Sequence, residues 1–274
     1  MNAQTINDLA VTEERRTGGL PRFITDTSAV FRREFMLVLR DPFSLVFSLL
    51  QPLVFLALFA PLLAGLIGDG GIGGANTLQW FLPGVVVMIC VFGTGMVGSN
   101  LQYEMQTGSY ERILATPLSR SSILTGRALK EFAPLVVQAL MITLIASIFG
   151  VTLYPVQMML GMLILGVFGI GLGALSYALA IATHGKEWMF WTIQQTLTFP
   201  LLILSGMMLP LDSGPAWMQI VAKINPLTYV VNAERELFAG NLDSLAVLWG
   251  AVAAVAMCAG GLAVGIRTIS RSAR

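Results

Sequence analysis

Residues 132–183 read FAPLVVQALMITLIASIFGVTLYPVQMMLGMLILGVFGIGLGALSYALAIAT, and no Asp, Glu, Lys, Arg or His interrupts them. These 52 residues are too many for one membrane-spanning helix, since about 20 apolar residues cross the ~30 Å hydrocarbon core of a bilayer. Gly150 and Tyr154–Pro155 are typical helix breakers and lie within the run. The stretch therefore predicts two successive transmembrane helices.

The rest of the chain has the same apolar character. Of its 274 residues, 55% are hydrophobic and 11% are charged, whereas ordinary soluble domains carry roughly 25% charged residues. A soluble fold of this length could not bury so much apolar surface, so lipid is the expected solvent. Further gaps between charges predict four more spans, and hence an all-α protein with six transmembrane helices. The predicted spans lie near residues 44–67, 80–101, 132–153, 157–183, 188–210 and 245–266.

The basic residues predict the orientation, because they accumulate on the cytoplasmic side of a membrane protein. With the N terminus inside, six spans bring the C terminus inside as well, and 14 of the 16 Lys and Arg residues then lie inside. The inner set is Arg15, Arg16, Arg22, Arg32, Arg33, Arg40, Arg112, Arg120, Arg127, Lys130, Lys186, Arg267, Arg271 and Arg274, and the outer set is Lys223 and Arg235. Both termini are therefore expected in the cytoplasm.

Four segments are assigned around this topology. Residues 1–22 are expected to be a disordered cytoplasmic tail, residues 43–267 the transmembrane domain, and residues 268–274 a second cytoplasmic tail. Residues 23–42 form a candidate amphipathic helix on the inner surface, or else an ordinary positive flank of the first span. Its apolar face carries Phe23, Thr27, Val30, Phe31, Phe35 and Val38, while Arg33 and Arg40 lie on another face.

The longest inner segment between spans follows the second span. Residues 104–116 contain a short predicted helix that ends at Thr116, because Pro117 follows it. Ile113 and Leu114 would be apolar residues on an otherwise polar helix outside the membrane. Exposed apolar side chains in that position are explained if another protein docks there.

The longest outer segment, residues 211–240, predicts a helical hairpin between spans five and six. Trp217, Ile220, Val221 and Ile224 follow helical spacing on one face, Asn225-Pro226 suits the start of a second helix, and Gly240 suits its end. The two helices are too short and, with Glu234, Arg235 and Glu236, too charged to span a bilayer. They are expected to re-enter the membrane or to cover a cavity.

Chemistry for catalysis is missing from the sequence. No Walker-A pattern, G-x-S-x-G, H-E-x-x-H or C-x-x-C occurs. His184 is expected to be a solvated turn residue, and Cys90 and Cys258 to be buried apolar residues without a metal. A net charge of +1 argues against binding to nucleic acid through bulk positive charge. The chain is therefore not expected to be an enzyme.

Uncharged polar residues gather in two spans. Thr192, Gln195 and Thr196, together with Phe199, share one face of the fifth span, and the second span carries a similar set: Thr94, Ser99 and Asn100. Such a surface suits a pathway for an amphiphilic substrate. The alternative is hydrogen bonding between helices, which is worth about 0.6 kcal/mol for each bond in membrane proteins.

Two stretches carry a family resemblance. Glu104…GSYERILATPLSR (108–120) and Phe199…LSGM (204–207)…Pro210…PAW (215–217)…NPLTY (225–229)…Arg235 resemble the ATP-binding cassette (ABC) type-2 permease family, in particular its daunorubicin-exporter type. The resemblance extends over the whole chain, because both stretches occur in order around six predicted spans. The departures are Ser109-Tyr110, where Thr-Leu is usual, and Met207-Met208 after the Ser-Gly pair.

The resemblance implies roles for named residues. Residues 104–116 would be the coupling helix, which contacts a separate ATPase subunit through Glu104, Gly108, Tyr110, Glu111, Arg112, Ile113 and Leu114. Spans two and five would line the substrate pathway with Thr94, Ser99, Asn100, Thr192, Gln195, Thr196 and Phe199. The hairpin would form an outer gate with Met207, Met208, Trp217, Asn225, Pro226 and Tyr229.

The resemblance also implies partners and a function. A pair of ATPase subunits would bind ATP and Mg, a second copy of the chain or a related permease would complete the pathway, and lipid would surround both. The chain is thus expected to be the permease subunit of an exporter that moves a hydrophobic or amphiphilic substrate across a bacterial cell membrane by alternating access. The alternatives are an ATP-independent carrier or channel, and a membrane-embedded enzyme or assembly factor.

Overall fold

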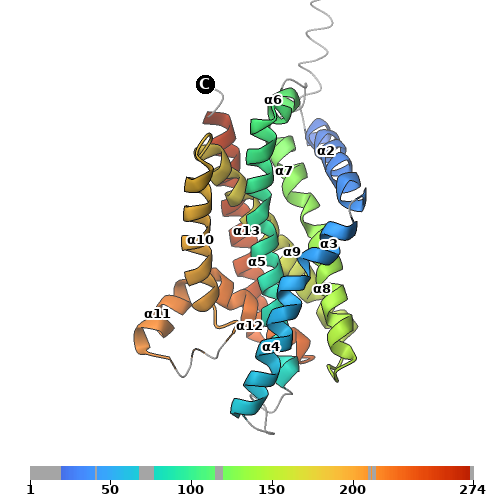
Figure 1. Ribbon diagram of the computed structural model, residues 1–274, viewed down its shortest axis with the longest axis vertical. Helices are drawn as coiled ribbons and strands as arrows, with labels where there is room; N and C mark the ends of the chain where they lie inside the picture. The colour runs from blue at the N-terminus through green and yellow to red at the C-terminus, as the bar shows by residue number, and fades with distance from the viewer. Residues whose placement is uncertain are drawn as a thin grey trace, which may run out of the picture.

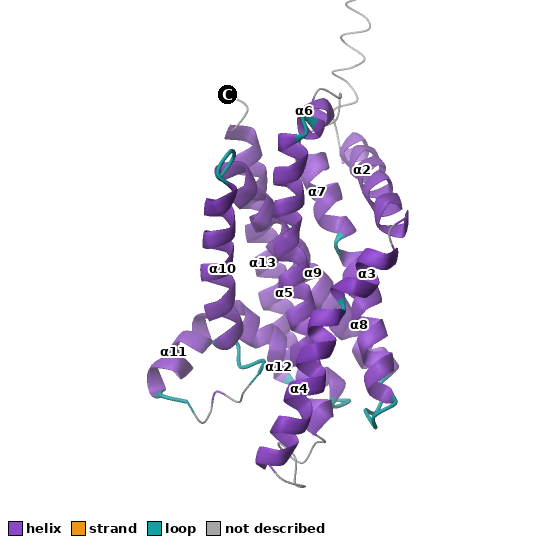
Figure 2. Ribbon diagram, viewed as in Figure 1, coloured by secondary structure: helices purple, strands orange, loops and turns teal. Residues whose placement is uncertain are grey.

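The computed structural model describes residues 20–40, 42–67, 77–114, 120–208, 211 and 214–271. Throughout these ranges the regular secondary structure is helical and no strand occurs (Figure 2). The predicted all-α class is therefore confirmed for the described chain. In chain order the helices are α2 (Leu20–Arg40), α3 (Pro42–Ser48), α4 (Leu50–Ile67), α5 (Thr77–Gln106), α6 (Ser109–Leu114), α7 (Arg120–Lys130), α8 (Phe132–Ser147), α9 (Pro155–Ala182), α10 (Glu187–Ile203), α11 (Ala216–Ile224), α12 (Pro226–Phe238) and α13 (Leu245–Arg271).

Five helical runs of the described chain are long and apolar enough to cross a membrane. They are Val46–Leu63, Thr77–Gln106, Ser122–Ser147, Pro155–Ala182 and Leu245–Ile269. The chain is therefore a multi-pass membrane protein. The fifth predicted span, 188–210, corresponds to α10, which is shorter because the chain turns at Gly206, where φ is +75°.

The predicted third span, 132–153, starts where α8 starts, at Phe132, but extends too far at its C-terminal end. Its helix α8 ends at Ser147, and the chain turns through Gly150, whose φ of +93° suits glycine. At the other end α7 leads almost directly into α8, with a break at Glu131. Pro134 explains the break, because proline has no N–H to donate to the carbonyl of Lys130.

The helices form one elongated bundle (Figure 1). One end carries α2, α6 and the C-terminal end of α13, and we call it the α6 end. The opposite end carries α11, α12 and the C-terminal end of α4, and we call it the α12 end. The helix α10 runs along the bundle between the two ends.

The centre of the bundle is α5, whose residues from Phe81 to Val91 are all buried. It packs against α4, α8, α9 and α12, and α13 packs against α9 and α12. The α9–α13 contact is very close. A Cβ on Gly261 would lie 2.2 Å from the carbonyl oxygen of Gly171, so glycine is required for this approach.

Two predicted boundaries differ from the ends of the described helices. The helix α2 begins at Leu20, within the predicted tail 1–22, and α13 continues to Arg271, past the predicted boundary at residue 267. Residues 1–19 and 272–274 lie outside the described residues.

Candidate functional site

A buried charge cluster joins three helices at the α6 end. Arg127 of α7 pairs with Glu104, in the last turn of α5, and its Nε lies 3.6 Å from a carboxylate oxygen of Glu34 on α2. Lys130 lies 3.3 Å from the other oxygen of Glu34. The side chains of Arg127 and Glu34 are only 3% and 4% exposed. Opposite charges at this depth hold α2, α5 and α7 together, because an unpaired charge there would be costly.

An apolar contact adds α6 to the same unit. Val30 of α2, Ile113 of α6 and Ile123 of α7 form a small buried cluster. A Cβ on Gly126 of α7 would lie 2.8 Å from the Cβ of Val30, so α2 and α7 pack very closely. The expectation that Ile113 is exposed is wrong, because its side chain is covered by α2 and α7 and is only 6% exposed.

The helix α6 is shorter than the predicted coupling helix 104–116. Glu104 belongs to α5, and the chain turns through Gly108, where φ is +68°, before α6 begins. Tyr110 packs against the apolar cluster at the end of α5, and Arg112 is exposed. The side chains of Glu111 and Leu114 and the whole of residues 115–119 lie outside the description.

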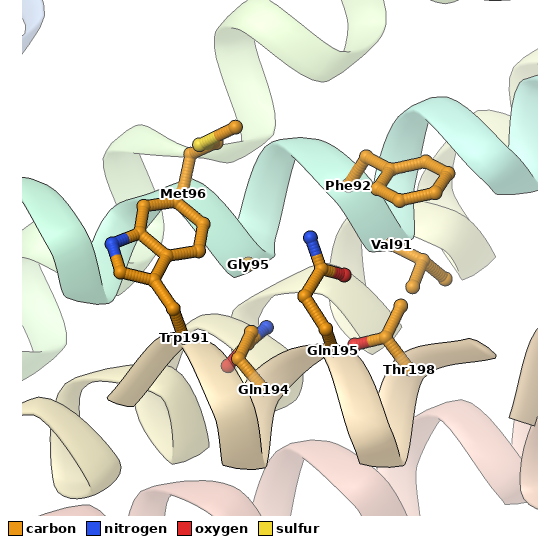
Figure 3. A pocket seen from close by; sticks show the side chains of 8 residues that line it. All are labelled: Val91, Phe92, Gly95, Met96, Trp191, Gln194, Gln195 and Thr198. Atoms are coloured by element: carbon orange, nitrogen blue, oxygen red, sulfur yellow. The ribbon is translucent and has the colours of Figure 1, made fainter. Parts of the chain in front are cut away.

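A second feature is an open pocket between α5 and α10 (Figure 3). From α10 it is lined by Trp191, Gln194, Gln195 and Thr198, and from α5 by Val91, Phe92, Gly95 and Met96. Figure 3 shows the α10 side chains lying toward α5. The surface is thus apolar and aromatic with two amides.

Most predicted pathway residues lie on open surface. Thr192, Gln195, Thr196, Phe199 and Asn100 are exposed, and Ser99 is half-buried. The hydroxyl of Thr192 donates to the carbonyl of Trp188 in its own helix, and Ser99 donates likewise to Met96. These two bonds lie within single helices, so they do not support hydrogen bonding between helices.

Thr94 differs from the other predicted pathway residues. Its side chain is only 2% exposed. Its hydroxyl donates to the carbonyl of Cys90, and its methyl group faces Gly169 of α9. The structure therefore places Thr94 in the core between α5 and α9, away from the pocket.

A third feature lies at the α12 end, around Arg235 of α12. Its Nη2 donates to the carbonyl oxygens of Gly206 at 2.7 Å and Met207 at 3.2 Å, and its guanidinium carbon lies 3.7 Å from the ring centroid of Trp80 on α5. A Cβ on Gly84 would lie 2.4 Å from the Met207 carbonyl oxygen. The turn after α10 is thereby fixed between α5 and α12.

The predicted start of α12 is confirmed. Asn225 caps the helix by accepting from the N–H of Leu227, and its amide donates to the carbonyl of Leu201 at 2.8 Å. Pro226 is the first residue of the helix. Thr228 donates to the carbonyl of Leu204, so the same turn of α12 also holds the end of α10.

The other predicted gate residues lie at different depths. Met207 is buried and Met208 is half-buried, whereas Trp217 on α11 is 60% exposed. The hydroxyl of Tyr229 donates to the carbonyl of Lys223 at 2.7 Å, which joins α12 to α11. Asn225, Pro226, Met207 and Tyr229 therefore belong to one contact region, and Trp217 does not.

Sequence reasoning missed Glu34, Arg127, Trp80 and the role of Arg235. From the sequence, Arg127 and Arg235 are an inner and an outer charge, and no contact is predicted for Glu34 or Trp80. A signal existed for Glu34, which follows Val30 at helical spacing on the apolar side of α2. Among the described residues, no group of three or more His, Cys, Asp or Glu could hold a metal ion.

The fold and these sites define a class: a helical, multi-pass membrane protein with a charged helical unit at one end and a closed polar contact region at the other. The comparison with protein families is specific. Residues 25–239 match the ABC-2 type transporter family, and the chain belongs to that family.

Similar proteins come from distant organisms. The chain is 31% identical to the transport permease ycf38 of Cyanophora paradoxa over 220 residues, which cover 79% of this chain and 75% of the relative. It is 28% identical over 210 residues to the daunorubicin resistance ABC transporter permease protein DrrB1 of Streptomyces coeruleorubidus, covering 76% and 73% of the two chains. It also matches ABC transporter G family member 20 of Dictyostelium discoideum at 28% identity over 162 residues, 58% of this chain and 22% of that longer protein.

Proposed function

We propose that the chain is the permease subunit of an ATP-driven ABC exporter. Two ATPase subunits, which bind ATP and Mg²⁺, would act on the α6 end, and a second copy of the chain would complete the pathway. Membership of the ABC-2 type transporter family supports this assembly, and DrrB1 is named as a permease of an ABC transporter. The chain itself carries no Walker-A sequence, so the energy comes from a partner.

The observation that carries the proposal is the path of α5. Near one end, its Glu104 is bound to the charge cluster; in the middle, Phe92 and Gly95 line the pocket; near the other end, Trp80 contacts Arg235. One continuous helix therefore touches all three features. A displacement of the α6 end is transmitted along α5 to the pocket and the α12 end, because a packed helix moves as a rigid element.

The substrate proposed is hydrophobic or amphiphilic. The pocket between α5 and α10 combines Phe92, Met96 and Trp191 with the amides of Gln194 and Gln195. The exposed face of α10 would meet the same face of a second copy around the substrate. Alternating access then means that the contact between α10 and α12 at Arg235 opens while the α6 end closes.

The orientation proposed follows the basic residues. With α10 counted as a span, the chain crosses the membrane six times, and α2 and the end of α13 lie on the same side of the membrane, as they do in the bundle (Figure 1). The excess of Lys and Arg at this end makes it cytoplasmic. The membrane proposed is the bacterial cell membrane, and the α12 end is then the outer exit.

The test is a double substitution in α6. The tagged chain is first purified to identify the ABC ATPase that co-purifies with it. The two proteins are then co-expressed and reconstituted in vesicles. Glu111→Ala with Arg112→Ala is expected to lower transport-linked ATP hydrolysis at least about tenfold, a loss of ~1.4 kcal/mol of coupling. Arg267→Ala, an exposed charge on α13, is the matched control and keeps the wild-type rate.

Two results would contradict the proposal. Unchanged coupling in a fully assembled double variant would remove α6 from the ATPase contact. Substrate transport by vesicles that contain the chain alone, driven by an ion gradient, would instead identify an ATP-independent carrier.

A further inference from the structure

A carboxyl group is buried without a partner in the α12 end. Glu234 is 0% exposed, and neither of its carboxylate oxygens has a hydrogen-bond partner among the described residues. It lies on α12, which packs against α5, α9, α11 and α13. Burial of this kind is rare, because an ionised carboxylate in an apolar site requires a cation or several donors.

The carboxyl group occupies a space that a glycine provides. A Cβ on Gly161 of α9 would lie 2.4 Å from Oε2 of Glu234 and 3.1 Å from Oε1. On the α13 side, a Cβ on Gly250 would lie 2.3 Å from the Cβ of Ala233. The carboxyl group is therefore enclosed by protein.

Across the described helices that pack against α12, no cation lies against Glu234. On α5 the nearby titratable group is the thiol of Cys90. The sequence of α9 contains no charged residue, and α13 contains none before Arg267. Lys223 of α11 is exposed. On α12 itself, Arg235 is turned to Trp80 and the 206–207 carbonyls, and Glu236 accepts from Asn241 at the surface.

We propose that Glu234 is a proton-binding site, protonated while the α12 end is closed and deprotonated when α12 moves away from Gly161. The link to movement comes from the neighbouring contacts. Arg235, Asn225 and Thr228 attach α12 to the end of α10, so opening this contact displaces α12. The carboxyl group then leaves its enclosed site and meets water. The proposed proton site is argued from the burial of Glu234 and does not depend on a transport function. The link between this site and the opening of the α12 end does rest on the proposed function.

The sign of the pH effect follows from burial. Burial raises the pKa of Glu234 to about 8, while an exposed glutamate titrates near 4.3. Below about pH 4.3 both conformations carry the proton, and pH has no effect on their balance. As the pH rises from there to about 8, the open form loses its proton first. The open form is therefore favoured by up to about tenfold for each pH unit.

The first experiment detects the proton directly. Infrared spectra of the assembled complex in lipid nanodiscs are recorded at pH 7 for the wild type, Glu234→Gln and Glu234→Met. The wild-type-minus-variant difference spectrum, in which carboxyl bands common to all the proteins cancel, is expected to show the C=O band of a protonated carboxylic acid for both variants. Glu236→Gln, two residues along α12, is the matched control, and its difference spectrum lacks this band. Met needs no hydrogen-bond partner and is close in length, so this variant is expected to fold even if the Gln variant does not.

The second experiment measures the link to movement. Hydrogen–deuterium exchange of the α12 amides is followed from pH 5.5 to 7.5 and corrected with an unfolded peptide of the same sequence. The equilibrium constant for opening of α12 is expected to rise by up to about a hundredfold in the wild type and in Glu236→Gln. In Glu234→Met it is expected to stay constant.

The outcomes separate the two parts. Difference spectra that lack this band for both Glu234 variants would overturn the proton site. Difference spectra that show the band as expected, together with equal pH dependence in all proteins, would overturn the switch and leave the exporter proposal intact. Loss of coupling to the ATPase in the α6 experiment has no bearing on the infrared result.

Discussion

At the scale of single residues, Arg235 makes contacts that a planar cation is suited to make together. It donates to the Gly206 and Met207 carbonyl oxygens, and its guanidinium carbon lies 3.7 Å from the centroid of the Trp80 ring. Lysine has the charge but not the fork of donors, and it stacks less well on an aromatic ring. The identity of this side chain therefore matters beyond its charge.

Arg235→Gln is expected to destabilise the chain by about 2 kcal/mol or more, because hydrogen bonds from a charged group contribute about 1.5–3 kcal/mol and the ring contact about 0.5–2 kcal/mol. Arg235→Lys should lose about half as much. Denaturant unfolding of the purified chain in nanodiscs measures both. Lys223→Gln, an exposed cation on α11, serves as the control. A Lys variant as stable as wild type would show that charge alone suffices.

At the scale of elements, the pair α9 and α13 depends on the absence of a side chain. A Cβ on Gly261 would meet the Gly171 carbonyl oxygen at 2.2 Å, whereas a Cβ on the adjacent Gly260 would meet nothing within 4 Å. Both glycines lie in the same helix and have the same intrinsic helix propensity. They differ only in what they face.

Gly261→Ala is therefore expected to destabilise the bundle by about 1–3 kcal/mol, the usual cost of overpacking, since α9 and α13 must separate. Gly260→Ala should be neutral or slightly stabilising, because alanine favours helix more than glycine does. Thermal unfolding in the same detergent compares the two. Equal melting temperatures would mean that the α9–α13 contact is looser in solution than the structure describes.

The two ends of α12 could be predicted from the sequence. Asn225-Pro226 predicted the start of α12, and Gly240, with φ of +92°, predicted its end, because caps depend on local chemistry. The burial of Ile113 and Thr94 could not be predicted. Ile113 is covered by α2, and Thr94 faces α9, so both depend on which distant helix packs where. Charge gaps locate helices in membranes but do not show which side chains meet.

At the scale of the whole molecule, α10 stands apart from the other long helices. It contacts α5 and α9 only weakly, and it exposes large apolar side chains on a face that also carries Thr192 and Thr196. The exposed apolar residues are Trp188, Leu197, Phe199, Leu201 and Ile203. Lipid accounts for the apolar residues, and the Thr192 hydroxyl is already hydrogen-bonded within its own helix. The proposed second copy of the chain would cover the same face.

Thr196→Cys, in a background with Cys90 and Cys258 replaced by Ser, is expected to form disulfide-linked dimers under mild oxidation in membranes. The expectation rests on symmetry, because a two-fold axis brings equivalent residues of the two copies together. Val255→Cys on α13, also exposed, should stay monomeric. Non-reducing gels measure the yield. Equal cross-linking at both positions would indicate random collision and contradict pairing through α10.

The charge cluster at the α6 end also constrains how the chain is made. Glu34 and Lys130 are 96 residues apart, and α4 and α5 lie between them. A nascent chain thus exposes α2 well before the ribosome has delivered its binding partner α7. Until then α2 has no charged partner on α7. Its stacked Phe31 and Phe35 allow it to lie among the lipid headgroups. Docking of α2 through these charges can therefore begin only after α7 has been synthesised.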